Sequence, residues 1–418
     1  MSIADLLRTP LIELPLRNRN YGLYSLGSAV SLTGMWMERI AIGWLTWKLT
    51  ESGFWLGVVA FADFFPVIVI APFAGAVADR RDRLSLVKTS QFVLLAQAVV
   101  LFAATASGHI NVALIVLLTA IHGIVVAFNQ PARLALVPSL VPRADLGPAV
   151  AINSIIFNLA RFIGPIFAGL AIVWSGVAAA FAANALSYVV FLIALARIRI
   201  VPGEDDAAPA APRSFFADIT EGIRYTATHP GIGTLFVLLI AIGVGGRPLT
   251  ELLPGFADEV FRAGADGRCQ DRQPAGAILS GVWLGHRAQK SNLMAVTLAT
   301  TLGQALSAVA IIATDRLWLA VPAVAAYGFC ISAAGIASQT LVQLASARAM
   351  RGRVMALYGL IFRGGPAIGA LGAGIISVHL GLRWPVVIGA LLLVAAWLWA
   401  YLIRERIAAA LREPDAEP

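Results

Sequence analysis

Seven ionisable residues stand inside long apolar stretches of this chain. They are Glu38, Arg39, Asp63, Arg161, Arg247, Glu251 and Arg363. A charge at the centre of a bilayer costs about 2.5–3.5 kcal/mol on insertion scales, so such residues face a cavity or a partner of opposite charge. A carboxylate in a dry cavity binds a proton and an arginine binds an anion. The pattern predicts a pathway for a proton or a small molecule, with a set of ion pairs near the outer surface as the alternative.

Asp63 is the first choice for proton coupling, because it stands alone in an otherwise apolar stretch. A second polar group is the run from Gly75 to Arg83, which fits the pattern G-x-x-x-D-R-x-x-R with Asp79 and Arg80 at its centre. We expect Asp79 to cap the helix that follows and to pair with basic groups. Pairs that form and break would make this loop a gate; the alternative is a loop whose arginines anchor the topology.

The elements that carry these residues are membrane spans. Of 418 residues, 59% are hydrophobic and 13% are charged, whereas soluble domains average about 45–50% and 25%. The sequence therefore predicts an all-α membrane protein with twelve transmembrane helices. They are residues 21–47, 54–78, 84–106, 112–128, 146–173, 177–196, 232–256, 275–285, 293–313, 317–338, 354–378 and 385–403.

The basic residues indicate the orientation of these spans. Arginines are frequent in the N-terminal tail and in the connections on its side of the membrane, such as Arg17, Arg81 and Arg133. Connections rich in Lys and Arg stay in the cytoplasm. We therefore expect a multi-pass protein of the inner (plasma) membrane with both termini inside. The net charge of +8 has the same origin, and we expect no nucleic-acid partner.

The eighth span is atypical. Residues 266–274 are polar, and about eleven apolar residues follow where a span needs about 20. A pair of compensating frameshifts in the gene would produce such a change; codons without an apolar reading in a shifted frame would refute this hypothesis. If the polar run is native, we expect the second half to pack poorly. A carrier that is damaged here and no longer transports is therefore an alternative.

The chain divides into two related halves. We expect an N-terminal six-helix bundle at 1–197, a cytoplasmic linker with an amphipathic helix at 198–229, and a C-terminal six-helix bundle with a cytoplasmic tail at 230–418. Arg161 and Arg363 precede Gly-Pro pairs in the fifth and eleventh spans. Repeated motifs in the same order indicate an internal duplication.

The loop from Gly75 to Arg83 resembles the signature loop of the major facilitator superfamily of transporters. Residues 129–142, 153–161, 247–258 and 351–358 resemble the branch that contains the bacterial enterobactin exporter, macrolide efflux proteins and "transmembrane secretion effector" members. Gly164, Pro165 and Gly169 are similar to part of the antiporter motif of drug exporters, in which a kinked, closely packed helix favours export.

The resemblance implies two pseudo-symmetric bundles that work by alternating access. It also implies proton-driven export of a drug-like or siderophore-like small molecule by a monomer in the lipid bilayer. In this branch, Gly75, Asp79, Arg80 and Arg83 form the gating loop. An importer of nutrients or other solutes with the same fold is an alternative.

Motifs for ATP binding, metal binding and nucleophilic catalysis are absent from the sequence. The sequence has no G-x-x-x-x-G-K-[ST] loop for ATP, and its two cysteines, Cys269 and Cys330, are far apart. No metal-ligating or nucleophilic constellation is present in the sequence. We therefore expect no enzyme, no metal and no cofactor, with the proton motive force as the energy source.

Overall fold

The computed structural model describes residues 18–199, 215–261, 293–347, 350–405 and 407. Every regular element in these ranges is a helix. The first six long helices are α3 (Arg19–Thr50), α4 (Gly53–Arg80), α5 (Arg83–Ala106), α6 (Val112–Leu136), α7 (Leu146–Ser175) and α8 (Val177–Ala196). Two short 3₁₀ turns, Val137–Ser139 and Arg143–Asp145, connect α6 to α7.

The second part of the chain begins with the short helix α9 (Phe215–Thr228). The next span is divided into α10 (Pro230–Ala241), η3 (Ile242–Gly246), α11 (Pro248–Gly255) and η4 (Phe256–Val260). It is followed by α13 (Leu293–Ile312), α14 (Leu317–Ala345), α15 (Arg351–Leu380) and α16 (Arg383–Leu402).

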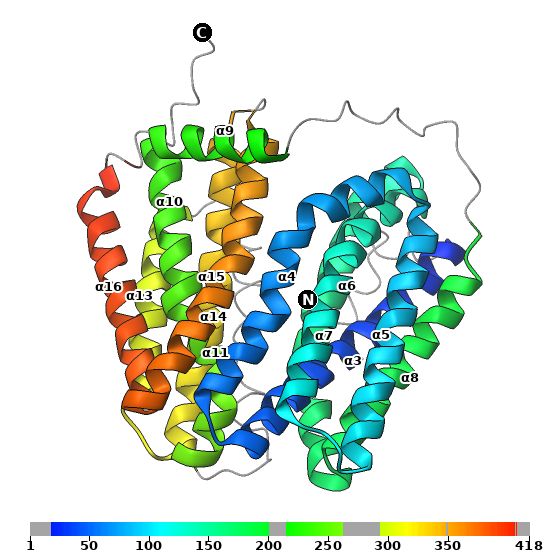
Figure 1. The fold of residues 1–418 in the computed structure, drawn as a ribbon. Helices are drawn as coiled ribbons and strands as arrows, with labels where there is room; N and C mark the ends of the chain where they lie inside the picture. Colours follow the sequence, from blue (N-terminus) through cyan, green and yellow to red (C-terminus); the bar gives the residue numbers. More distant parts are fainter. Residues whose placement is uncertain (1–17, 200–214, 262–292, 348–349, 406, 408–418) are drawn as a thin grey trace, which may run out of the picture. The chain divides into compact units, whose positions relative to one another are not determined.

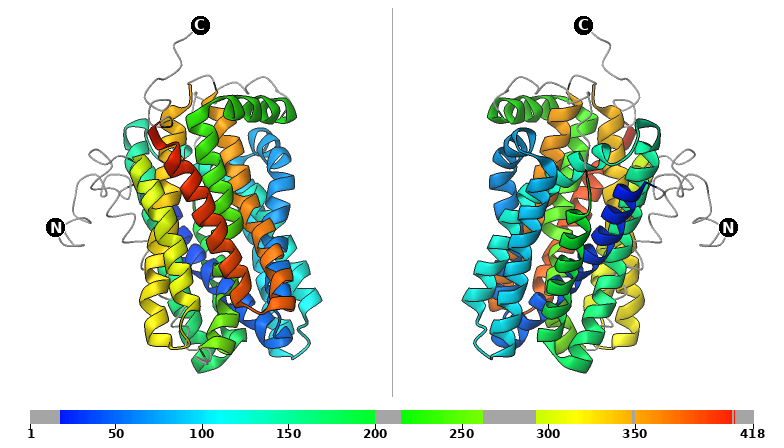
Figure 2. Two further views of the ribbon diagram at one scale, coloured as in Figure 1. Left: turned by 90° about the vertical axis from the view of Figure 1, so that its left-hand side faces the viewer. Right: turned by 90° about the vertical axis from the view of Figure 1, so that its right-hand side faces the viewer.

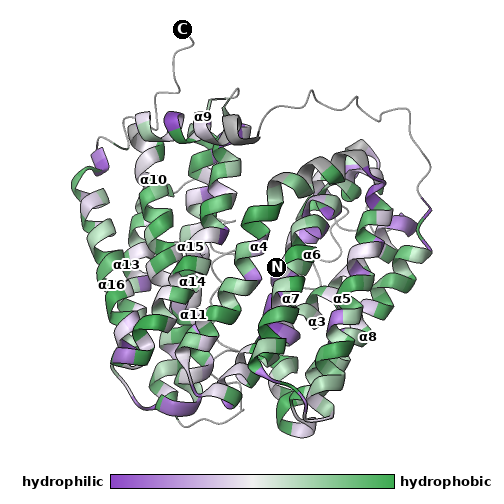
Figure 3. Ribbon diagram, viewed as in Figure 1, coloured by the Kyte–Doolittle hydropathy of each residue, from purple (hydrophilic) through white to green (hydrophobic). Residues whose placement is uncertain are grey.

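Ten helices in the described ranges are long and apolar enough to cross a membrane. This confirms the all-α membrane class. The first helix, α3, is not among the ten, because serines, glycines and the Glu38–Arg39 pair interrupt its apolar character. The predicted eighth span lies outside the described residues. Figure 3 shows hydrophobic residues along most helices and hydrophilic ones mainly near their ends.

The predicted seventh span differs from a regular helix in two places. The segments η3 and η4 are π-helices, in which Arg247 N–H donates to the carbonyl of Ile242, and Phe261 N–H to that of Phe256. Pro248 and Pro254 lack the N–H that a regular helix needs at their positions. The helix therefore changes its hydrogen-bond register beside each proline, as π-bulges do.

The contacts divide the chain into two compact units (Figure 1). The first consists of residues 1–45 and 69–211, and the second of residues 46–68 and 212–418. The boundaries therefore cross α3 and α4 in mid-helix. The division into bundles at 1–197 and 230–418 stays a prediction.

The second unit is built around its seventh span. In the most apolar window of residues 231–260, 67% of the residues are buried, more than in any other described span. Ile232, Leu235 and Phe256 belong to its core cluster. Figure 2 shows α13 beside α14, with α16 next to them. In the first unit, Tyr21, Leu136 and Phe191 belong to a core cluster between α3, α6 and α8.

The helix α9 lies within the predicted linker, across the ends of α10 and α15 (Figure 1). Glu221 forms an ion pair with Arg353 at 2.9 Å. Gly222 lies against the backbone of Arg353, and the hydroxyl of Tyr225 accepts a hydrogen bond from Ala347 N–H at 3.3 Å. α9 is therefore fixed to the start of α15.

One joint occurs twice. Gly176 connects α7 to α8 with φ 79° and ψ 171°, and Gly381 connects α15 to α16 with φ 84° and ψ 167°. This backbone region is accessible almost exclusively to glycine. The fifth-to-sixth and eleventh-to-twelfth connections therefore use the same turn, as an internal duplication would produce.

Candidate functional site

The end of α3 packs against the seventh span through a polar contact within the second unit. Lys48 Nζ lies 2.8 Å from Oδ1 and 3.0 Å from Oδ2 of Asp258, and Trp47 Nε1–H donates to Oδ2 of the same carboxylate at 3.0 Å. The Lys48 side chain is 45% exposed and that of Asp258 25%. Asp258 lies in η4, so the end of α3 is held to the seventh span.

Glycines extend this contact along α4 and α15. A Cβ atom on Gly374 would lie 2.8 Å from the carbonyl oxygen of Gly53, and one on Gly57 would overlap the carbonyl oxygen of Ala370. The two backbones therefore touch without side chains between them. We call the contact of residues 47–57 with 255–258 and 370–377 the outer seam, because these helix ends are predicted to lie outside.

Asp63 and Arg363 come together deeper along the same pair of helices. The Asp63 carboxylate acts electrostatically on the Arg363 guanidinium. One residue further, a Cβ atom on Gly364 would lie 3.2 Å from Cδ1 of Ile68. This juxtaposition favours an ion pair between the two residues, and their role in the pathway stays a prediction.

Glu38 lies in a different place, inside the first unit. It is 2% exposed. Gln97 of α5 donates from Nε2 to Oε1 of Glu38 at 2.9 Å, and Asn184 of α8 donates from Nδ2 to Oε2. Two amides from two other helices therefore surround a buried carboxylate.

Two arginines, one of them the sequence neighbour of Glu38, meet at one indole. Arg39 and Arg161 place their guanidinium carbons 6.0 and 5.5 Å from the Trp36 ring centroid. A Cβ atom on Gly164 would lie 2.5 Å from Cβ of Trp36. Glycine at this position therefore lets α7 approach α3. Two further residues of the predicted packing motif, Pro165 and Gly169, are buried in α7.

Arg247 lies directly after the first π-helix of the seventh span. Its guanidinium carbon is 4.2 Å from the Phe362 ring centroid, and Phe362 stacks on Tyr358. The carbonyl of Gly246 accepts a hydrogen bond from the hydroxyl of Tyr327. Glu251 follows Arg247 by four residues in α11, on the same helix face.

The loop between α4 and α5 corrects one expectation. Asp82 caps α5, accepting a hydrogen bond from Ser85 N–H at 2.7 Å, so the expected cap by Asp79 is wrong. α4 continues to Arg80, and a cap must stand immediately before the next helix. Arg83 Nη1 lies 3.4 Å from the carbonyl of Ala135 and from Oγ of Ser139. The surroundings of Gly75 and the side chains of Asp79 and Arg80 lie outside the part of the chain that the structure describes.

Arg133 was placed in a connection by the sequence, but the structure places it inside α6. The helix passes through Pro131 and ends at Leu136. Arg133 donates to the hydroxyls of Tyr24 and Ser28, and its guanidinium carbon lies 5.2 Å from the Phe191 ring centroid. The apolar residues after the proline were the signal that the helix continues.

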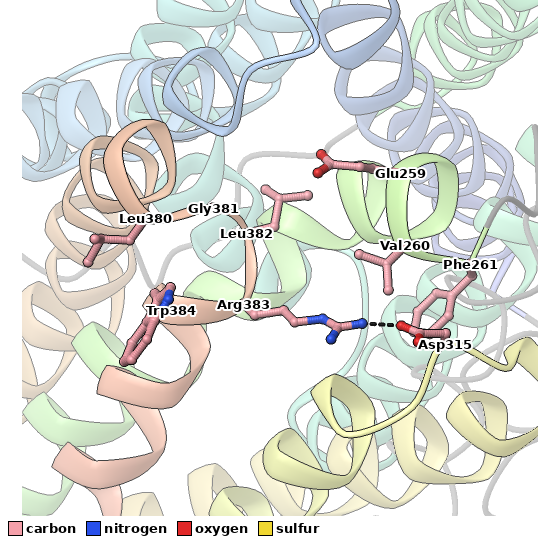
Figure 4. Close-up of a pocket in the computed structure, with 9 residues that line it drawn as sticks. All are labelled: Glu259, Val260, Phe261, Asp315, Leu380, Gly381, Leu382, Arg383 and Trp384. Carbon is pink, nitrogen blue, oxygen red and sulfur yellow. Dashed lines mark hydrogen bonds and ion pairs between the residues drawn. The ribbon is translucent and has the colours of Figure 1, made fainter.

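Among the described residues, two cavities are of interest. One, of about 670 Å³, lies in the second unit among helix ends that include Phe261, Asp315 and Gly381 (Figure 4). Arg383 points across it to an ion pair with Asp315, and Glu259 and Trp384 contribute to its lining. The other, of about 390 Å³, lies between α3, α7 and α8 of the first unit and is almost entirely apolar.

Comparison with known proteins shows the family to which the chain belongs. The family model "Transmembrane secretion effector" matches residues 13–416. The chain is 28% identical over 234 residues to the staphyloferrin A transporter of Staphylococcus aureus, covering 54% of this chain and 57% of that protein. It is 25% identical over 242 residues to macrolide efflux protein A of Streptococcus pyogenes, covering 56% and 58%. The matched region thus spans little more than half the length of these relatives.

A solved structure shows the same fold. The crystal structure of a bacterial homologue of the human lysosomal transporter Spinster, in an inward-facing and unoccupied conformation, superposes with a TM-score of 0.74 at 15% identity. It covers 94% of this chain and 98% of that one. This similarity confirms the predicted major facilitator architecture and carries no information on substrate.

Proposed function

Because this chain belongs to the transmembrane secretion effector family of major facilitator transporters, we propose that it exports a drug-like or siderophore-like small molecule in exchange for protons. The chain is a multi-pass membrane transporter and not an enzyme. The family match over residues 13–416 is the observation that carries the proposal. The names of the two relatives supply the substrate classes.

The outer seam supports alternating access. A carrier that releases substrate outside must separate its outer helix ends in one state and close them in another. The seam combines one partly exposed ion pair with direct backbone contact at Gly53, Gly57 and Gly374. A contact of this kind closes tightly and can still open, because few side chains interlock across it.

Glu38 supports proton coupling. A buried carboxylate that accepts hydrogen bonds from amides can exist with or without its proton, because each amide can both donate and accept. Asp63 acts electrostatically on Arg363, a residue of opposite charge. We therefore assign the proton to Glu38 and a gating ion pair to Asp63. We propose that the protein works as a monomer in the inner membrane, with both termini in the cytoplasm.

The test is intracellular accumulation of labelled erythromycin, ethidium and a catecholate siderophore in cells with and without the protein. We expect lower accumulation of at least one compound, and a protonophore should abolish the difference. Glu38→Gln, with its surface expression verified, should abolish it as well. Higher accumulation would favour an importer. Equal accumulation of every compound, with the protein in the membrane, would contradict export of these classes and favour the damaged carrier.

A further inference from the structure

The hydrogen bonds to Glu38 continue through Asn184 to a third polar side chain. Ser187, one turn after Asn184 on α8, donates its hydroxyl to the backbone carbonyl of Asn184 at 2.7 Å and to Oδ1 of Asn184 at 3.1 Å. Gly34 of α3 leaves the space for this arrangement, since a Cβ atom there would lie 2.5 Å from Oδ1 of Asn184 and overlap Oγ of Ser187. Ser187, Asn184 and Glu38 therefore form a hydrogen-bonded chain.

The Ser187 end of this hydrogen-bonded chain reaches a cavity. Gly34 and Ser187 both line the apolar cavity of about 390 Å³, together with residues such as Ala160, Ile163 and Ala183. Pockets for small molecules are mostly apolar, with a few polar groups that fix orientation, and start at about 300 Å³. Thr33, the other hydroxyl in the lining, is bonded to the carbonyl of Ala29 at 2.8 Å.

We infer that this cavity binds a mainly apolar molecule carrying a hydroxyl or N–H group, and that Ser187 and Asn184 transmit its binding to the proton on Glu38. The inference deepens the proposed function and rests on it. A donor on the ligand bonds to Oγ of Ser187, so that the Ser187 hydroxyl donates more strongly to Asn184. Hydrogen bonds in a chain strengthen one another, so the Asn184 amide then holds the ionised carboxylate better. The Glu38 proton leaves to water.

Other titratable groups lie on α3, α7 and α8. Arg39 on its own helix and Arg161 on α7 stack on Trp36, and their positive charge does not depend on the ligand. Tyr188 of α8 is buried against Leu94 and Ala98 of α5. The ligand therefore acts through Ser187 and Asn184, the two side chains that connect the cavity to the carboxylate.

The experiment uses two probes of nearly the same shape. 2-Naphthalenemethanol carries a hydroxyl that does not ionise near neutral pH, and its methyl ether lacks the donor. The full-length protein in nanodiscs is mixed with each probe in weakly buffered solution containing a pH indicator, and naphthalene fluorescence reports binding. We expect the alcohol to release protons and the ether to bind while releasing at least tenfold fewer. That factor corresponds to one lost hydrogen bond.

Four variants complete the test. Glu38→Gln should release no proton, and Ser187→Ala should release at least tenfold fewer at saturating alcohol. Ala183→Phe, which fills the cavity, should lose binding, whereas Leu186→Phe, exposed on the same helix and outside the cavity lining, should behave as the wild type. Equal release by alcohol and ether, full release from Ser187→Ala, or unchanged binding by Ala183→Phe would each overturn the inference.

The nanodisc experiment and the export experiment in cells can fail independently of each other. Protonophore-sensitive export in cells without ligand-induced proton release in nanodiscs would refute the coupling through Ser187 and leave the exporter standing. Proton release from the wild type but not from Glu38→Gln, without export of any compound in cells, would refute export of these compounds. It would leave the coupling of ligand binding to the Glu38 proton standing. Failure of the wild-type protein to bind either probe would refute the cavity as a ligand site.

Discussion

Replacing Asp258 by alanine should weaken the closed outer seam. The variant removes the partly exposed Lys48 ion pair, worth about 0.2–1 kcal/mol. It also removes the hydrogen bond from the Trp47 indole to a carboxylate, worth about 1.5–3 kcal/mol. Together these amount to about 2–4 kcal/mol, and each 1.4 kcal/mol is a factor of ten. We therefore expect opening of the seam to become about 30-fold to several hundred-fold more favourable.

The assay measures the reactivity of a cysteine placed inside the seam. Ser377 is buried beside Gly53, so Ser377→Cys reports opening once Cys269 and Cys330 are replaced by serine. When closure is faster than alkylation, the rate with a maleimide is proportional to the open fraction. The rate should rise by the same factor in Asp258→Ala, by less than about fivefold in Lys48→Met, and by an intermediate factor in Trp47→Phe.

The expected order of the effects is Asp258→Ala, then Trp47→Phe, then Lys48→Met. An unchanged rate in Asp258→Ala would refute the assignment of the seam as a gate. A larger effect of Lys48→Met than of Trp47→Phe would refute the argument from exposure, since it would make the solvent-screened pair the stronger contact. A double mutant of Lys48 and Trp47 that exceeds Asp258→Ala would show that the two contacts do not act through this carboxylate.

Three further predictions concern single residues. Gly57→Leu should keep the seam open, because its side chain would overlap the backbone of Ala370; we expect fast alkylation at position 377 and at least tenfold slower transport, and normal transport would contradict the close contact. Glu38→Gln in proteoliposomes should retain downhill substrate movement and lose its acceleration by a pH gradient, whereas a persisting acceleration would move the proton to another residue. Gly381→Ala should destabilise the protein by about 1–3 kcal/mol, because its φ of 84° lies in a region that other residues rarely adopt; a thermal-unfolding midpoint equal to that of the wild type would show that the turn relaxes without cost.

Local patterns in the sequence predicted most of the helices. The sixth span was placed at residues 177–196, where α8 begins and ends, because its apolar run is bounded by Gly176 and by Arg197. The amphipathic pattern after residue 215 predicted α9 in the same way. The fourth span was placed at residues 112–128, although the helix continues through Pro131 to Leu136.

The side-chain partners were not predictable in this way. Glu38 meets residues 59 and 146 positions away in the sequence, and amides such as Gln97 and Asn184 carry no charge that would mark them as its ligands. The π-helices depend on how the prolines of the seventh span combine with its packing against α15 and α16, which a hydropathy pattern does not contain. The cap at Asp82 depended on where α4 ends, and helix ends are the least certain part of a prediction.

Residues 46–68 belong to the second unit although they lie within the sequence of the first, and this has a consequence for biosynthesis. This hairpin leaves the ribosome early, yet the surface it contacts includes Ala370 and Gly374 of α15, among the last residues to be made. The hairpin must therefore remain in the lipid with its glycine surface uncovered while about 300 further residues are synthesised, at about 5–20 residues per second. Completion of the second unit, to which residues 46–68 belong, is thus delayed until the eleventh helix has been inserted, and truncation before that helix would leave the hairpin as a target for membrane quality control.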